Sequence, residues 1–459
     1  MTAAGGVARG VDRYRWVVLG VFMLVNLTIQ VLWISYAPVT GPAAEYYGVS
    51  ELQIGLLAMT FMIAFIPLSI PASWAIDTYG FRPAVGLGVA LMGVCGLLRG
   101  FAGHSYGLVL AATIGIAVAQ PFLLNAWTTV PAKWFPADGR ATAVGLVTLA
   151  NLVGTAIGMA LTPALTETLE MPTVQLIYGA AAAASAILFL ALAREAPTTA
   201  PGDSGAVDGR GDSGAVAVAD GAVDGVRALA LEGLRHALRV RPFLLMLAIG
   251  LIGLGIFNGI STWIESIVRP RGFTPTDAGA LGAVMVVGGL VGAVVIPLLS
   301  DRQHRRQRYL MVAVVGAIPG LLGLTFATPP ALLFVSAFVL GFFLVSALPV
   351  GMQYAAEVTY PTPEATSNGL IQLFGQGAVV FVYVMEAMKG SDGSFTPSLL
   401  LAVGLLVVGA GLVTRMPDPP ALDRRAQPTP VGGGTAVPAR ARPSTSRATA
   451  SGDVTSRTT

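Results

Sequence analysis

Long apolar stretches alternate with short polar segments along almost the whole chain. A helix needs about 20 apolar residues to cross the hydrocarbon core of a bilayer. The pattern therefore predicts an all-α membrane protein with twelve transmembrane helices. The stretches run over 15–37, 52–75, 84–101, 106–130, 140–165 and 174–193, and then over 243–266, 277–299, 309–326, 330–356, 364–388 and 395–414.

A polar segment divides the apolar stretches into two sets of six. It contains the sequence GDSGAV twice and is rich in Gly, Ala and Asp, which favours a flexible connection. The C-terminal end is rich in Pro, Thr, Ser and Arg, a composition typical of disorder. We expect a cytoplasmic N-terminal segment (1–14), an N-terminal six-helix bundle (15–193), a flexible cytoplasmic linker (194–241), a C-terminal six-helix bundle (242–414) and a disordered cytoplasmic tail (415–459).

Composition and charge fit this interpretation. The chain is 54% hydrophobic and 11% charged, so the lipid bilayer is its expected partner. The net charge of +3 comes from basic residues scattered through loops and tails, which does not predict nucleic-acid binding. If both termini are cytoplasmic, all but four of the 27 Lys and Arg residues lie on the cytoplasmic side, as expected in a cell membrane. The outward-facing four are Arg99, Arg269, Arg271 and Lys389.

The loops after the second and the eighth stretch repeat one pattern. Asp77 is followed by Arg82, and Asp301 is followed by Arg302. An acid and an arginine at matched places indicate a duplicated architecture, although charged loop ends are common in any membrane protein. The pattern resembles the cytoplasmic signature of the major facilitator superfamily, which implies that superfamily's fold of two six-helix bundles. The resemblance implies a gating role for Asp77, Arg82, Asp301 and Arg302, to which we add Glu357 at the inner end of the tenth stretch.

Polar side chains form stripes on three of the predicted helices. A polar side chain in a membrane is costly unless it faces protein or water, so each stripe indicates a cavity wall or a helix-to-helix hydrogen bond. We expect the stripes to form the substrate site between the bundles. They comprise Asn26, Gln30 and Trp33, then Asn258 and Thr262 with Glu265, then Gln372, Gln376 and Tyr383 with Glu386.

Two further expectations concern the charges in and near this site. Glu265 and Glu386 fall near the outer helix ends, where Arg269 and Lys389 follow at i+4 and i+3. No ionisable residue is expected at mid-membrane, which argues against proton coupling and for facilitated diffusion. Neutral amides with a tryptophan suit a small organic cation, because the ring face attracts positive charge. The alternative for Trp33 is an anchor at the membrane surface.

Several segments resemble the feline leukaemia virus subgroup C receptor family of the same superfamily. They include Leu32-Trp33-Ile34-Ser35-Tyr36, Leu348-Pro349-Val350-Gly351 and Glu357-Val358-Thr359-Tyr360-Pro361. The resemblance implies transport of choline and ethanolamine, and haem export is also assigned to the family. It further implies that Trp33 covers the ammonium group and that Gln376 lines the same pocket. Two positions depart from the family: Leu152, beside Asn151, replaces a glutamine, and Asn258 replaces a tyrosine.

The sequence thus predicts a facilitative carrier for choline-like or other organic cations, which works by alternating access. We expect a monomer with a small-molecule substrate and with no cofactor or metal. One alternative is a carrier or exporter of another metabolite, a drug or haem, although haem would need axial ligands and His104, His236 and His304 lie in loops or in the linker. Another is a non-transporting sensor or receptor. No nucleophile, metal-ligand or phosphate-loop pattern predicts an enzyme.

Overall fold

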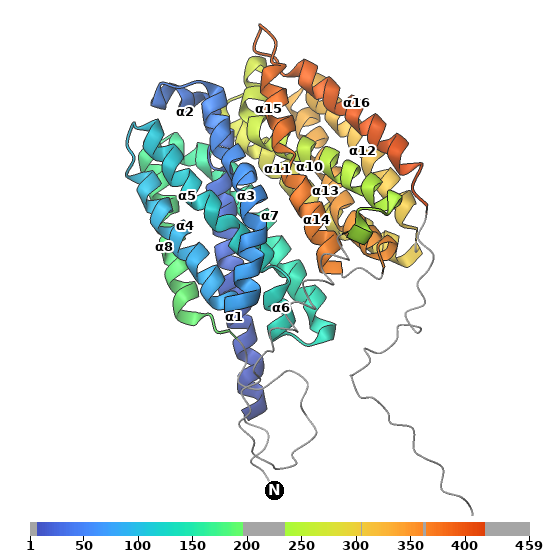
Figure 1. Ribbon diagram of the computed structural model, residues 1–459. Coiled ribbons are helices and arrows are strands. Elements are labelled where there is room, and N and C mark those ends of the chain that lie inside the picture. Colours follow the sequence, from blue (N-terminus) through green and yellow to red (C-terminus); the bar gives the residue numbers. More distant parts are fainter. Residues whose placement is uncertain (1–6, 196–234, 304, 361–363, 418–459) are drawn as a thin grey trace, which may run out of the picture. The chain divides into compact units, whose positions relative to one another are not determined.

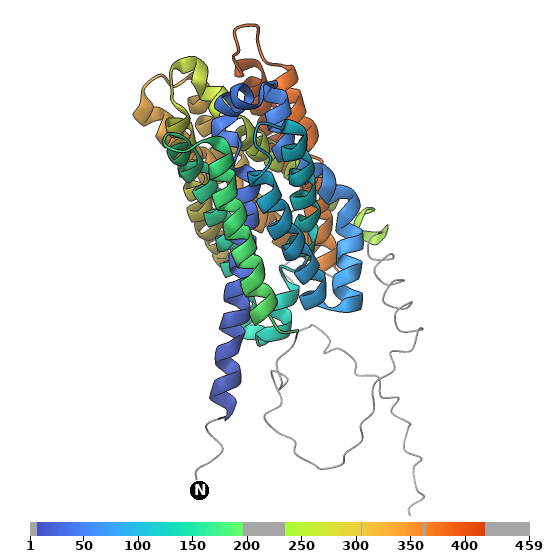
Figure 2. The ribbon, with the colours of Figure 1, turned by 90° about the vertical axis from the view of Figure 1, so that its left-hand side faces the viewer.

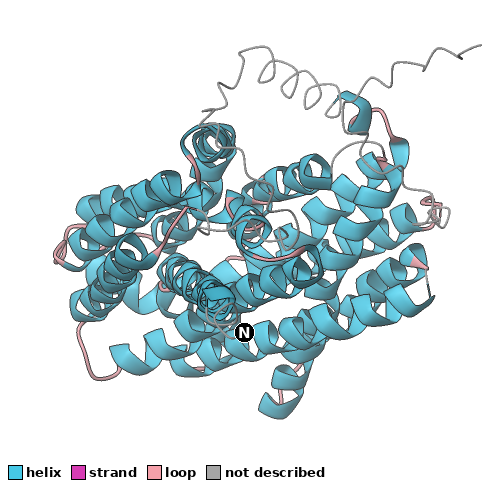
Figure 3. Cartoon of the chain, turned by 90° about the horizontal axis from the view of Figure 1, so that it is seen from below, coloured by secondary structure: helices cyan, strands magenta, loops and turns pink. Residues whose placement is uncertain are grey.

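The computed structural model describes residues 7–195, 235–303, 305–360 and 364–417, and this part of the chain consists of helices joined by short loops, without strands (Figures 1 and 3). Twelve of its helices are long and apolar enough to cross a membrane. The predicted all-α fold with twelve spanning helices is confirmed. Most of the predicted linker and nearly all of the predicted tail lie outside the described residues.

The first six spans belong to the N-terminal half, shown in blue to green in Figure 1. Its elements are α1 (Val7–Ile34), η1 (Ala37–Val39), α2 (Thr40–Tyr47), α3 (Glu51–Tyr79), α4 (Phe81–Gly100), α5 (Tyr106–Asn125), α6 (Thr129–Trp134), α7 (Ala137–Thr166) and α8 (Met171–Leu192). The last six spans form the C-terminal half. Its elements are α10 (Arg241–Val268), η2 (Arg269–Arg271), α11 (Pro275–Gln303), α12 (Arg306–Phe326), α13 (Pro330–Val358), α14 (Glu364–Gln376), α15 (Val379–Ala387) and α16 (Thr396–Val413).

Local sequence explains where several helices begin and end. Gly48 adopts a left-handed conformation (φ 66°) and ends α2. Ser50 then opens α3 with a capping box: its hydroxyl accepts from the Gln53 amide at 3.3 Å, and the Gln53 side chain accepts from the Ser50 amide at 3.0 Å. The eleventh predicted stretch is divided into α14 and α15 next to Gly377, a residue with low helix propensity.

The two ends of the helical bundle are distinguished by their contacts. At one end the Tyr14 hydroxyl of α1 donates to the Leu192 carbonyl of α8 at 2.7 Å, close to where the linker begins. We call this the linker end, and Figure 2 shows α1 projecting there beyond its neighbours. The opposite end, which holds η1, α2 and η2, we call the far end.

The halves meet most extensively where α7 packs against α11. A Cβ at Gly279 of α11 would collide with the backbone carbonyl of Met159 in α7, so glycine permits this close approach, and the Met159 side chain packs over Gly282. Both glycines lie in the first turns of α11, which begins at the far end. The closest packing between the halves is therefore concentrated toward that end.

Candidate substrate site and gates

The polar stripe on α1 contains buried acceptors that the protein does not use. Asn26 is fully buried; its amide nitrogen donates to the Phe22 carbonyl of its own helix at 2.8 Å, and its Oδ1 has no described partner. Gln30, one turn further, is half-buried, and its Oε1 also lacks a partner among the described residues. Hydrogen-bond donors are thus missing on this face of α1.

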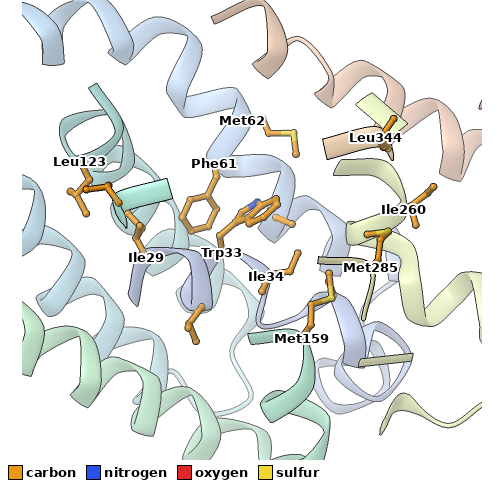
Figure 4. Packing of buried hydrophobic residues seen from close by; sticks show 14 of the residues in the cluster. Ile29, Trp33, Ile34, Phe61, Met62, Leu123, Met159, Ile260, Met285 and Leu344 are labelled. Atoms are coloured by element: carbon orange, nitrogen blue, oxygen red, sulfur yellow. The ribbon is translucent and has the colours of Figure 1, made fainter. Parts of the chain in front are cut away.

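Trp33 lies in the last turn of α1 and is only 8% exposed. Figure 4 shows its ring alongside Phe61 of α3, in a buried cluster that also contains Ile260 and Met285 of the C-terminal half. A tryptophan that anchors a helix at the membrane surface keeps contact with the headgroup region. The burial of Trp33 is therefore inconsistent with the anchor alternative, and its ring packs inside the protein beside α3 (Figure 4).

The stripe on α10 is buried, and the helix bends beside it. Asn258 is 9% exposed and Thr262 is 1% exposed, and the Thr262 hydroxyl has no described partner. The next residue, Trp263, departs from helical geometry (φ −103°, ψ 15°). Its Nε1 donates to the Val382 carbonyl of α15 at 2.9 Å, and a Cβ added to Gly55 of α3 would lie 2.7 Å from its Cζ2.

Trp263 therefore joins three helices from both halves, a role that the sequence does not reveal. Its position in an apolar span resembles that of many tryptophans near a membrane surface. The only local signal is Gly55, whose lack of a side chain makes room for the ring. That pairing of residues far apart in the sequence becomes visible only in the folded chain.

The third stripe is more exposed than the other two. Gln372 and Gln376 of α14 are half-buried and make no described side-chain hydrogen bond, while Tyr383 of α15 is 56% exposed. Both helices contact α10 and α3. The helices that carry the second and third stripes are therefore neighbours, and α3, whose Phe61 lies beside Trp33 (Figure 4), contacts all of them.

A network of charges joins the halves at the far end. Glu51 of α3 accepts from Arg269 of η2, from Lys389 at 2.6 Å and from the Ser266 hydroxyl at 3.1 Å. Glu265 of α10, almost fully buried, accepts from the Gly41 backbone amide at 3.0 Å. We call Gly41, Glu51, Glu265, Arg269 and Lys389 the far-end gate, because their contacts hold α2 and α3 against the C-terminal half.

Two expected pairings are confirmed within this region. The Glu265 and Arg269 side chains approach to 3.7 Å, and so do the Glu386 and Lys389 side chains. Both follow from helical spacing. Glu51 was not predicted, since its partners lie more than 200 residues away in the sequence.

At the linker end of the C-terminal half, the arginine that pairs with Asp301 is Arg306, whereas the sequence suggested Arg302. Arg306 is buried and pairs with Asp301, with Glu357 at 3.1 Å and with the Ser300 hydroxyl at 3.1 Å. Arg302 is exposed and makes no described ion pair. Asp301 and Glu357 are therefore joined through Arg306, inside one half.

The N-terminal half has a different arrangement at the linker end. Glu195, just after α8, accepts from the backbone amides of Phe81 at 3.1 Å and of Arg82 at 2.7 Å, and pairs with Lys133. Burial would raise the pKa of Glu195, but the Lys133 ammonium and these two amides outweigh burial and lower it. Asp77 is exposed and makes no described hydrogen bond. Glu195 and Lys133 were missed because neither lies in the repeated loop pattern.

These contacts make the two ends of the molecule unequal. Ion pairs connect the halves at the far end, whereas every described ion pair at the linker end stays within one half. Arg99 was expected on the outward side, and its bonds to Leu32 and Ser35 at the end of α1 place it toward the far end, but it does not reach the surface. It is a residue of α4, 1% exposed, and it lies inside the N-terminal half.

Comparison with known proteins now identifies the family. The Major Facilitator Superfamily model matches residues 18–383 and 271–443. The chain belongs to the major facilitator superfamily. It is a multi-pass membrane transporter and not an enzyme.

Named relatives agree with the resemblance found in the sequence. Solute carrier family 49 member A3 of Danio rerio is 29% identical, over 84% of this chain and 81% of its own. The choline/ethanolamine transporter FLVCR2 of Homo sapiens is 27% identical, over 88% of this chain and 77% of its own. Among solved structures, the chain is similar to a bacterial homologue of the human lysosomal transporter Spinster in an inward-facing and unoccupied conformation. The two are 17% identical with a TM-score of 0.65, and the match covers 88% of this chain and 97% of the homologue. This likeness supports the fold alone.

Proposed function

We propose that the protein is a facilitative carrier that moves choline-like organic cations across the cell membrane by alternating access. In this proposal Trp33 faces the cationic group, and the amides of Asn26, Gln30 and Gln376 receive the hydrogen-bond donors of the substrate. Asn258, Thr262, Gln372 and Tyr383 complete the substrate path. The relatives named as choline/ethanolamine transporters support this substrate class.

The observation that carries the proposal is a buried aromatic ring close in sequence to unpaired acceptors. The face of a tryptophan attracts a cation, and the attraction strengthens when the cation is desolvated. A buried acceptor without a donor costs about 1–3 kcal/mol. Asn26 Oδ1 and Gln30 Oε1 are such acceptors. A cation that carries a hydroxyl or an N–H group would satisfy them, whereas an anion brings acceptors and would leave these two oxygens without donors.

The direction of opening follows from the proposed orientation. We place both termini, the linker and the tail in the cytoplasm, so that the far end is extracellular. We propose that the far-end gate closes the extracellular side and that the protein is inward-facing in this arrangement. On switching, contacts of Asp77, Arg82, Asp301, Arg302 and Glu357 would rearrange to close the cytoplasmic side. We propose that a monomer, with bundles over 15–193 and 242–414, performs this cycle.

Uptake of labelled choline and ethanolamine into proteoliposomes tests the proposal. We expect saturable uptake that follows an inside-negative membrane potential and does not respond to a pH gradient. Trp33→Ala should raise the half-saturation constant about tenfold, the effect of losing a desolvated cation–π contact, while Trp33→Phe should retain most of the affinity. Trp74→Ala, which removes an exposed tryptophan of α3, is the matched control.

Two results would overturn the proposal. Uptake no greater than in empty vesicles, with protein that still melts cooperatively, would exclude choline-like substrates. Saturable uptake that Trp33→Ala and Trp74→Ala affect equally would remove Trp33 from the binding site.

A further inference from the structure

An arginine is buried behind the substrate-facing part of α1. Arg99 of α4 is 1% exposed and forms no ion pair with a described carboxylate. Its Nη1 donates to the Leu32 carbonyl at 3.0 Å and its Nη2 donates to the Ser35 hydroxyl at 3.3 Å. The guanidinium also lies over the Tyr36 ring, 5.4 Å from its centroid.

These contacts fall where α1 ends. The helix stops at Ile34, and the chain continues through η1 into α2. The last carbonyls of a helix lack donors from their own backbone and tend to fray unless other groups satisfy them. In this turn the Ser35 hydroxyl donates to the Leu32 carbonyl at 3.1 Å, and Arg99 donates to both residues. A cation is also favoured at a helix C-terminus by the helix dipole.

Trp33 lies between the two residues that Arg99 holds. The proposed substrate-facing ring therefore belongs to a helical turn whose stability depends on a side chain from another helix. A buried charge without a counter-ion is costly, and an apolar residue would avoid that cost. An apolar residue could not, however, donate to Leu32 and Ser35 together. The guanidinium fork provides both bonds from one group.

The same segment also reaches the far-end gate. Six residues beyond Ser35, the Gly41 amide donates to Glu265 of α10. The chain from Ser35 to Gly41 is thus fixed at one end by Arg99, within its own half, and at the other end by a contact between halves. When the far-end gate opens, the Gly41 contact is lost, while the Arg99 contacts are internal to the N-terminal half.

We infer that Arg99 is a positioning residue for substrate binding, which holds the last turn of α1 so that Trp33 keeps its orientation when the far-end gate opens and closes. This inference rests on the proposed role of Trp33. Its direct consequence, an ordered end of α1, does not depend on the substrate.

Hydrogen–deuterium exchange of the purified protein in nanodiscs tests that consequence. Arg99→Gln should speed the exchange of amides in a peptide over 30–40. Arg271→Gln is the matched control, because Arg271 also caps carbonyls, those of Leu324 at 2.9 Å and Ala327 at 3.3 Å, in the C-terminal half. It should leave peptide 30–40 unchanged. Unchanged exchange over 30–40 in Arg99→Gln would overturn the inference, even if the protein transports another solute.

Transport kinetics test the link to Trp33. Arg99→Gln should raise the half-saturation constant about tenfold, with a smaller change in maximal rate. In a Trp33→Ala background, Arg99→Gln should add little, because the two residues act as one unit. Fully additive effects would overturn the positioning role. If Arg99→Gln does not fold, Arg99→Lys, which cannot make both bonds of the guanidinium fork, and Ser35→Ala, which removes one Arg99 bond and the Ser35–Leu32 bond, should show the same pattern at reduced size.

Discussion

Glu51 is the central acceptor of the far-end gate, and replacing it isolates the contribution of charge to closing that side. Glu51→Gln keeps the size of the side chain and an acceptor oxygen, but it removes the negative charge that Arg269 and Lys389 share. We expect the equilibrium to shift toward a state open at the far end. The fold of each half should be unaffected, because these two pairs connect the halves.

The size of the shift can be worked from exposure. The side chains of Lys389 and Glu51 are 20% and 21% exposed, so their pair falls near the lower part of the range of about 1.5–3 kcal/mol for charged hydrogen bonds. Arg269 is 38% exposed, and its pair belongs with surface pairs of about 0.2–1 kcal/mol. Together they give about 2 kcal/mol, which is roughly a 30-fold change in the open population.

A reporter cysteine measures this population. The chain has one cysteine, Cys95, so Cys95→Ala provides a cysteine-free background. Ser261→Cys then places a thiol one turn inward from Glu265, at a fully buried serine whose hydroxyl has no described partner. A membrane-impermeant maleimide should label this thiol from the far end roughly 30 times faster in Glu51→Gln.

Glu45→Gln is the matched control, since Glu45 is exposed in α2 and makes no described ion pair. It should leave the labelling rate unchanged. Equal labelling of the Glu51 and Glu45 variants would refute the assignment of Glu51 as a gate, and the closed far end would then have to depend on apolar packing and on the Gly41–Glu265 contact.

Further predictions concern packing and the linker end. Gly55→Ala should also speed labelling at position 261, because the added methyl meets the Trp263 ring, whereas Gly20→Ala has open space and should not. Arg306→Gln removes the cation that Asp301 and Glu357 share and should lower the unfolding free energy by about 1–2 kcal/mol in denaturant melts, compared with no change for the exposed Arg302→Gln; the cost stays moderate because Asp301 is 60% exposed. The pKa of Glu195 is lowered in the folded protein, so the Glu195 contacts contribute fully to stability above pH 4.5, the ordinary pKa of a glutamate. This contribution is lost as the pH falls below 4.5. Melting temperatures measured down to pH 3.5 should therefore fall less in Glu195→Gln than in the unaltered protein.

The helices and the short-range pairs could be predicted because their causes are local. Apolar length predicts a spanning helix, and helical spacing predicts the Glu265–Arg269 and Glu386–Lys389 pairs. The stripe on α10 was found in the same way, from its angular spacing.

The gate and the support of Trp33 depend on contacts between distant segments. Glu51 resembles any acid at a helix start until folding brings Lys389 to it. The sequence predicted only the side of the membrane on which Arg99 lies, and an arginine near the end of an apolar stretch usually reaches the membrane surface. Only the packing of α4 beside the end of α1 shows that its donors point inward.

The unequal ends indicate what must drive the conformational cycle. At the linker end, Lys133 is satisfied by Glu195, and Asp301 and Glu357 are satisfied by Arg306, each within its own half. Groups already paired offer little attraction across the opening, because a new partner must replace an existing one. Closing the linker end also requires breaking the contacts of Glu51 at the far end. A ligand can shift such an equilibrium only by its differential affinity for the two states. In the proposed facilitative cycle, the free energy for closing the linker end therefore comes from substrate contacts that form between the halves, and substrate binding is coupled to the change of conformation in this way.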